Sequence, residues 1–176
     1  MATILGGGIQ VAIAALQALN ATVPSISLNG VMYQVQRFPT NYPPGLETAF
    51  LPCTIVFPEA GESATYADTK QTIRNFRMST YVDPLNQGKY DDPIQAAFML
   101  LQAYLEVYLD KISSTQDRTI LDFGATSEYL VQLLPYQSNP ILDSGVVTNL
   151  KYTTEEDNYV GFDITVKVLI EWVKNC

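Results

Sequence analysis

Two acidic clusters are the groupings in this sequence whose residue types could do acid–base or metal chemistry. The first is Asp91-Asp92, and the second spans residues 155–157. Paired carboxylates can bind a hard cation or exchange protons with a substrate. Asp92, however, directly precedes Pro93, and this order is typical of a helix N-cap. The second cluster lacks the alternating ligands and the glycine of a calcium loop. We therefore predict a helix cap for the first cluster and a solvated turn for the second.

The only run of glycines is Gly6-Gly7-Gly8. A phosphate-binding loop ends in Gly-Lys-Ser or Gly-Lys-Thr after a strand, and a dinucleotide-binding fingerprint needs its own glycine spacing after a strand. The run meets neither requirement. We interpret it as a flexible start before the first helix.

The sequence contains no histidine. It therefore lacks the side chain that most often binds metals and acts as a general base at neutral pH. Serine and threonine nucleophiles need an activating partner, and no local motif places one of the lysines beside them. Cys53 and Cys176 are too few and too distant for a zinc site. We predict no catalytic residue, no metal site and no cofactor, and we interpret both cysteines as free thiols.

The composition predicts a folded domain with few charges. The chain has 176 residues, of which 47% are hydrophobic and 16% are charged, whereas about 25% charged is usual. We expect one domain over residues 1–176. Ten Lys and Arg residues against 18 Asp and Glu give a net charge of −8. The sequence therefore shows no basic footprint for gripping nucleic acid.

Uncharged and aromatic residues indicate surfaces that neighbours cover. Between residues 1 and 46 the only charged side chain is Arg37, which suggests burial within the domain or against a partner. The eleven tyrosines are a surplus, and tyrosine is enriched at protein interfaces. We expect about half of them to complete the core and take the surplus as support for assembly.

The N-terminal half predicts a helix and a hairpin. Residues 9–20 carry apolar side chains three and four apart, without the basic start of a signal peptide or the length of a membrane span. Residues 52–57 form an apolar run, and residues 72–82 alternate as a strand does. We expect these two strands to form a hairpin over residues 52–82. The small, polar and acidic residues 58–71 would be its exposed tip.

The C-terminal half predicts a long helix and a second hairpin. The helix spans residues 93–112 and has an apolar stripe made by Ile94, Ala97, Phe98, Leu101, Leu105, Tyr108 and Ile112. Residues 126–134 fit a short helix or a strand, and we favour the helix. Two alternating strands around an acidic turn predict a hairpin over residues 145–172. The predicted fold class is α+β, with a mostly antiparallel sheet and helices packed on one face.

This order of elements resembles the tail terminator and neck proteins of long-tailed bacteriophages. The resemblance rests on the charge-poor first helix, the Leu51-Pro52 entry into a strand, the hairpin with a polar tip and the long amphipathic helix. It also rests on the final stretch DNYVGFDITVKVLIEW, in which a tyrosine-glycine turn leads into a last alternating strand. The similarity covers most of the chain and is one of architecture, without a short diagnostic motif.

The resemblance implies a ring-forming structural virion protein that is not an enzyme. In that family the subunits form a ring, usually a hexamer, which caps the tail tube and joins it to the head-tail connector protein. DNA passes through the lumen without specific binding, and an acidic chain is compatible with this passage because like charges repel. The implied location is the tail or neck of the virion, assembled in the host cytoplasm, with no membrane partner.

Two other classes of function stay open at this point. One is another phage neck, head-completion or tail-tube component. The other is an enzyme or a small-ligand binder. The size of the assembly separates the classes. The tail terminator and the other phage components predict a closed or stacked assembly of many copies, whereas an enzyme or a small-ligand binder does not.

Overall fold

The computed structural model describes residues 7–20, 25–28, 31–33, 36–37, 45–46, 51–59, 71–82, 92–113, 121–125, 129–134, 142–152 and 159–172. In chain order its elements are α1 (Gly7–Asn20), β1 (Ile26–Leu28), β2 (Val31–Tyr33), β3 (Gln36–Arg37), β4 (Cys53–Pro58), β5 (Gln71–Val82), α2 (Pro93–Ser113), β6 (Leu121–Ala125), β7 (Tyr129–Leu133), β8 (Leu142–Asp143), β9 (Val147–Leu150) and β10 (Tyr159–Trp172). Strands β1 and β2 form a small antiparallel sheet of their own.

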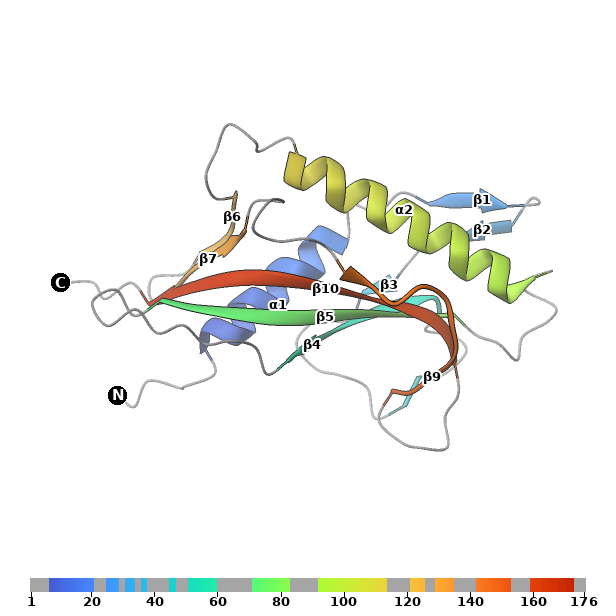
Figure 1. The fold of residues 1–176 in the computed structure, drawn as a ribbon, viewed down its shortest axis with the longest axis horizontal. Helices are drawn as coiled ribbons and strands as arrows, with labels where there is room; N and C mark the ends of the chain where they lie inside the picture. The colour runs from blue at the N-terminus through green and yellow to red at the C-terminus, as the bar shows by residue number, and fades with distance from the viewer. Residues whose placement is uncertain are drawn as a thin grey trace.

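Strand β10 lies at the centre of the main sheet (Figure 1). On one edge it pairs antiparallel with β5, from Val160 opposite Val82 to Glu171 opposite Gln71. On its other edge it pairs in turn with β9, β8 and β7. The sheet continues outward through β4 and β3 on one side and through β6 on the other. Among the described strands only the short β3–β4 pair is parallel, so the sheet is mostly antiparallel, as predicted.

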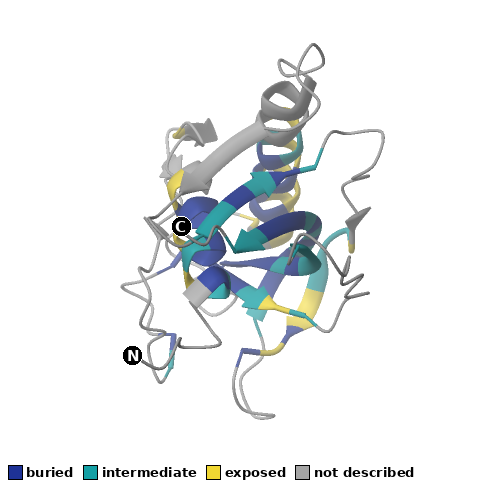
Figure 2. Ribbon diagram, turned by 90° about the vertical axis from the view of Figure 1, so that its left-hand side faces the viewer, coloured by how far each residue is buried: buried dark blue, intermediate teal, exposed yellow. Residues whose placement is uncertain are grey.

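Both helices pack on the same face of this sheet. Alternate side chains of β5 and β10, among them Met78, Phe162 and Ile164, share one core with Leu16 of α1 and Leu100 of α2. Figure 2 shows buried residues along the strands and on both helices. This arrangement confirms the predicted α+β class with helices on one face, because a sheet needs a second layer to cover its apolar side.

A second, smaller core covers one end of the opposite face of the sheet. It is made by Leu46, Leu51, Cys53, Ile55, Tyr81, Leu150 and Tyr152. Strand β5 is therefore buried on both faces from Met78 to Val82, whereas residues 71–75 are half-buried. Strand β10 keeps the predicted alternation over most of its length: Val166 and Val168 are fully buried, and Lys167 between them is half-buried.

Helix α2 begins as predicted but turns a different stripe toward the sheet. The Asp92 carboxylate accepts hydrogen bonds from the backbone N–H groups of Ile94 and Gln95, both at 3.1 Å, which confirms the N-cap. The buried stripe comprises Ala96, Ala97, Leu100, Leu101 and Tyr104. The prediction that Ile94 and Phe98 belong to the core was wrong, since both are more than half exposed. The small Ala96 and Ala97 allow the helix to approach the strands closely, and they define the inner face instead.

The helix favoured for residues 126–134 was also wrong. Residues Tyr129–Leu133 form strand β7, in which Val131 and Leu133 are buried. Strand β7 pairs with β10 through Val168 opposite Leu133 and Ile170 opposite Val131. The two-residue period of burial fits a strand, and pairing with the exposed edge of β10 decides between two local conformations.

Most other predicted elements are confirmed. Helix α1, the β4–β5 hairpin, α2 and β10 have nearly the predicted bounds, and the predicted strand over residues 145–152 is the short strand β9. The acidic turn over residues 153–158 and most of the predicted hairpin tip, residues 60–70, lie outside the described residues. The tyrosine-glycine pair is not a turn, because Tyr159 and Gly161 both lie inside β10.

Gly161 of β10 lies close to the backbone of β5. A Cβ atom at this position would lie 1.9 Å from the Thr80 carbonyl oxygen of β5. The pairing of β10 with β9 also shifts register between Tyr159 and Gly161. Glycine at such an irregularity lets two backbones come together where any side chain would force them apart.

Replacing Gly161 by alanine is expected to lower the free energy of unfolding by at least about 2 kcal/mol, because the β5–β10 ladder must open to admit the methyl group. Urea unfolding followed by circular dichroism measures the loss. Gly45→Ala is the matched control, since no atom lies within 4 Å of its added Cβ. The control should change stability by less than about 0.5 kcal/mol. Equal effects of the two variants would contradict the close approach.

Candidate functional site

The residues that could do chemistry have structural roles where the structure describes them. Asp92 caps α2. Gly8 packs its Cα against the strands, because an added Cβ would lie 2.6 Å from Ile170 Cγ2. No group of three or more His, Cys, Asp and Glu residues that could hold a metal ion occurs among the described residues. Cys176 and residues 155–157 lie outside that part of the chain.

Cys53 is a free and fully buried thiol on β4. Burial away from water raises the pKa of this thiol from 9.0 to about 12. The thiolate is the nucleophilic and metal-binding form of cysteine, so at neutral pH Cys53 is an inert core residue.

A chain of buried hydroxyl groups ties α2 to the sheet. Thr54 Oγ1 lies 2.8 Å from Thr80 Oγ1 and 2.5 Å from the Tyr104 hydroxyl oxygen. All three residues are fully buried. Burial also raises the pKa of the Tyr104 hydroxyl above its ordinary value, partly offset by its hydrogen bonds to the two threonines. Satisfied polar groups of this kind fix one packing arrangement of a core, and this network therefore positions α2 over β4 and β5.

Helix α1 contributes a weaker polar contact to the same region. The Gln17 side chain, almost fully buried, donates a hydrogen bond of 3.5 Å to the Thr54 backbone carbonyl. Its Oε1 atom is buried and has no hydrogen-bond partner in the described structure. An unpaired buried acceptor lowers the stability of the fold. Gln17 therefore helps to orient α1 on the sheet and contributes little net stability.

The described tyrosines mainly hold the fold together. The Tyr81 hydroxyl donates to the Lys151 carbonyl at 2.9 Å, and the Tyr159 hydroxyl donates to the Leu46 carbonyl at 3.1 Å. Tyr81 also packs edge-to-face against Tyr152 and Tyr159, with ring centroids 5.8 and 5.6 Å apart. For these residues the core interpretation of the tyrosine surplus is the correct one.

Polar side chains gather on the sheet face that lies away from the helices. The Ser79 hydroxyl donates to the Asp163 carboxylate at 2.6 Å. Nearby, the Arg77 guanidinium lies 4.8 Å from the centroid of the Phe57 ring, and its Nε atom lies 3.4 Å from Glu59 Oε1. The Arg77–Phe57 contact is a cation–π interaction. On the β4–β5–β10 surface Ser79 therefore pairs with Asp163, and Arg77 contacts both Phe57 and Glu59.

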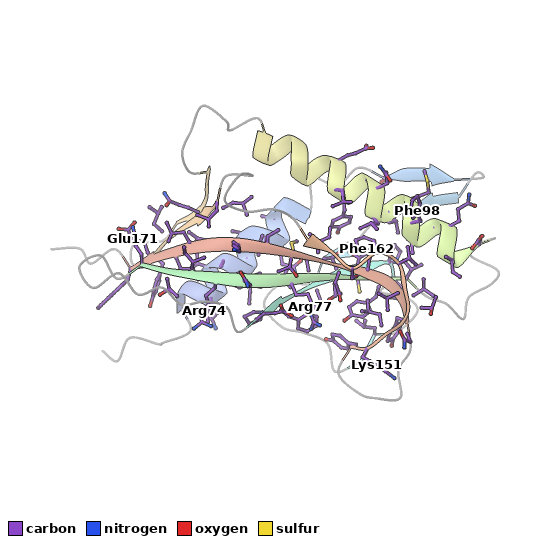
Figure 3. All side chains as sticks on the ribbon, viewed as in Figure 1. Arg74, Arg77, Phe98, Lys151, Phe162 and Glu171 are labelled. Atoms are coloured by element: carbon purple, nitrogen blue, oxygen red, sulfur yellow. The ribbon has the colours of Figure 1, made fainter. Side chains whose placement is uncertain are left out.

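The most distinct exposed apolar surface is on α2. Ile94 and Phe98 are 52% and 54% exposed, and Met99 is 37% exposed. These three residues lie in the N-terminal half of the helix, with Ile94 and Phe98 one turn apart, and we call them the α2 ridge. Figure 3 labels Phe98. The sequence analysis missed this surface because it assigned Ile94 and Phe98 to the core. The signal was present in the run AAFMLL at residues 96–101, which is apolar over a wider arc than one packed face can bury.

A small pocket lies at the far end of the β5–β10 ladder, where α1 begins. It has a volume of about 150 Å³, and its walls include Gly8, Thr72, Arg74, Tyr129, Ile170 and Trp172. We call it the end pocket. Among its described lining residues Arg74 alone is charged. These residues come from four different elements, so no pattern within one segment of the sequence predicts the pocket.

Comparison with known proteins does not assign the chain to a family. No protein-family model matches it, and no curated protein matches it either. Among the described residues, neither helix has the length and apolar character that crossing a membrane requires.

The buried hydroxyl chain should contribute measurably to stability. Tyr104→Phe removes one hydrogen bond from Thr54 and is expected to lower the free energy of unfolding by about 1 to 2 kcal/mol. Tyr159→Phe is the control, because its hydroxyl is only partly buried and water can replace its bond to Leu46. The control should lose about 0.5 kcal/mol or less. Equal losses in urea unfolding would show that the buried network adds nothing beyond an ordinary surface hydrogen bond.

Stability should fall in alkaline solution. The pKa of Cys53 is raised in the folded state, so above pH 9 the unfolded chain releases this proton first and unfolding becomes easier. The loss is expected to run between pH 9.0 and about 12, at up to about 1.4 kcal/mol per pH unit for this group. Cys53→Ala should delay the onset toward pH 10, where the buried tyrosines begin to contribute. An unchanged pH profile of urea unfolding in the variant would refute this assignment.

Proposed function

We propose that this protein is a structural subunit that forms a ring, and that it works as a tail terminator of a long-tailed bacteriophage. In this role the ring caps the tail tube and joins it to the head connector. The observation that carries the proposal is the order of elements. A charge-poor helix, a β4–β5 hairpin, a long capped helix and a final long strand follow one another in the order on which the resemblance rests, without its tyrosine-glycine turn.

The exposed α2 ridge supports an assembly role. Exposed apolar residues that lie next to one another mark sites of protein contact more often than single exposed residues do. The ridge joins Ile94, Phe98 and Met99 on the outer side of α2, so a free subunit would leave this surface in water. A neighbour that covers it would bury an aromatic ring, which is the side-chain type enriched at interface centres.

The net charge of the chain supports a role in which DNA passes beside the protein without being bound by it. The net charge is −8, and phosphate binding needs clustered lysine and arginine side chains. An acidic lumen would let DNA pass because it repels the phosphates. The polar groups on the β4–β5–β10 surface include Asp163 and Glu59 and are paired within the chain.

Under this proposal, substitutions impair function when they disturb core packing or assembly. Leu101 and Val166 are core residues, 6% and 0% exposed. Truncation to alanine is expected to cost about 2–4 kcal/mol for Leu101 and somewhat less for Val166. Glu155→Gln and Glu156→Gln should each change stability by about 0–1 kcal/mol. In cells that assemble the phage, the core variants should give tails of uncontrolled length or unjoined heads, and the glutamine variants should assemble normally.

The same variants test the proposal against a catalytic function. A structural role would be contradicted by a turnover-dependent activity that is lost when one exposed carboxylate is replaced, while folding and assembly stay intact. The Leu101→Ala and Val166→Ala strains give the second test. If the variant protein is unfolded in these strains and the tails still have normal length with heads joined, the terminator role is contradicted and another neck or tube component is favoured.

A further inference from the structure

We propose that the Phe98 ring of one copy inserts into the end pocket of a second copy, so that this chain associates with itself head to tail. The proposed ring would close through these two surfaces, and in this respect the inference rests on the proposed function. It is argued from two features of one chain: an exposed aromatic knob on α2 and a pocket of matching size at the other end of the sheet.

The knob is Phe98, the most exposed of the large hydrophobic residues in the described chain at 54%. Ile94 and Met99 flank it on the ridge. No charged side chain occurs on α2 between Pro93 and Glu106, so the ridge can leave water without desolvating an ion. Its burial against a neighbour would remove the largest exposed apolar group of the described helices from water.

The pocket is partly open, its lining mixes polar and apolar surface, and its volume matches a phenyl ring. Its volume is about 150 Å³, and an apolar cavity of about 150 Å³ in another protein binds benzene. Ile170, Tyr129 and Trp172 provide apolar and aromatic walls. Arg74 adds a cation at the wall, and a guanidinium stacks favourably on an aromatic face. The same chemistry already occurs in this protein, where Arg77 lies 4.8 Å from the centroid of the Phe57 ring.

The positions of knob and pocket favour head-to-tail contact. Figure 3 shows Phe98 and Arg74 in opposite halves of the long axis of the molecule. A contact between two different surfaces is heterologous, so each copy that uses its knob still offers a free pocket. Such contacts add copies in one direction until the rotation between neighbours closes a ring. The geometry therefore matches a head-to-tail assembly, as a ring or an open filament, better than a two-fold dimer.

The charges of the two surfaces are complementary. The pocket carries the positive Arg74. The ridge lies between two acidic residues, Asp92 before the helix and Glu106 two turns after Phe98, and both are exposed. In a chain of net charge −8 most surfaces repel a second copy. An acid-flanked ridge that docks beside an arginine avoids this repulsion, and such complementarity selects the partner surface.

Two single variants test the contact from both sides. Phe98→Gln removes the knob and keeps a helix-forming residue. Thr72→Phe fills the pocket from β5, where an aromatic residue is compatible with a strand. Sedimentation velocity of each protein is measured up to about 1 mM, a concentration that detects weak contacts. The natural chain should associate, and Phe98→Gln should weaken association at least about thirtyfold, as truncation of a central aromatic residue does.

Mixing the two variants gives the decisive result. Each variant alone should stay monomeric at concentrations where the natural chain associates. A mixture should form a one-to-one dimer and nothing larger, because one intact knob and one intact pocket remain. Dimer formation also shows that both variants are folded. Ile94→Gln is the matched control, since it removes a similar exposed area from the same helix. It should weaken association less than about threefold, as for a residue at the rim.

Four results would overturn the contact: a natural chain that stays monomeric over the whole range, association unchanged in Phe98→Gln, no dimer in the mixture, or equal effects of Ile94→Gln and Phe98→Gln. These outcomes are separable from the proposed function. If Phe98→Gln still forms rings on tail tubes, the contact is wrong and the terminator role stands. If the mixture forms its dimer but the natural chain never binds tail tubes, the contact stands and the terminator role fails.

Discussion

The long antiparallel ladder between β5 and β10 is the interaction on which the rest of the structure depends. It joins twelve residue pairs that are far apart in the chain, and its two faces supply both hydrophobic cores. On the helix face, Phe76 and Val166 anchor α1 and α2, and on the other face Tyr81 organises the aromatic cluster. The close approach at Gly161 lets the two strands stay in register where a side chain would separate them.

The elements that the sequence predicts well are those with strong local signals. Helix α2 has a capping aspartate followed by proline, and β10 alternates between buried and half-buried residues from Phe162 to Val168. The failures concern choices that only distant partners decide. Residues 129–133 become a strand because β10 offers an edge. Phe98 lies outside the core because α2 turns the face of Ala96, Ala97 and Leu100 toward the sheet, and the apolar spacing of the sequence fits both faces. The end pocket depends on the ends of α1, β5, β7 and β10 meeting, and no spacing within one element reveals it.

Several reactive groups of the described chain are engaged inside the fold. Burial keeps Cys53 protonated at neutral pH, and Thr54, Thr80 and Tyr104 bond to one another. Asp163 and Glu59 are paired on the open face of the sheet. Two surface features combine apolar or mixed side chains: the ridge on α2 and the end pocket. The proposed self-association would use both of them.

The central claim is that the chain forms a closed ring on a phage tail tube. The most direct measurement mixes the purified chain with tail tubes, sediments the tubes and counts the bound copies by electron microscopy of the tube ends. The account predicts one ring of about six copies at a tube end, at low or at moderate salt. Chain that stays in the supernatant at both salt concentrations would contradict it.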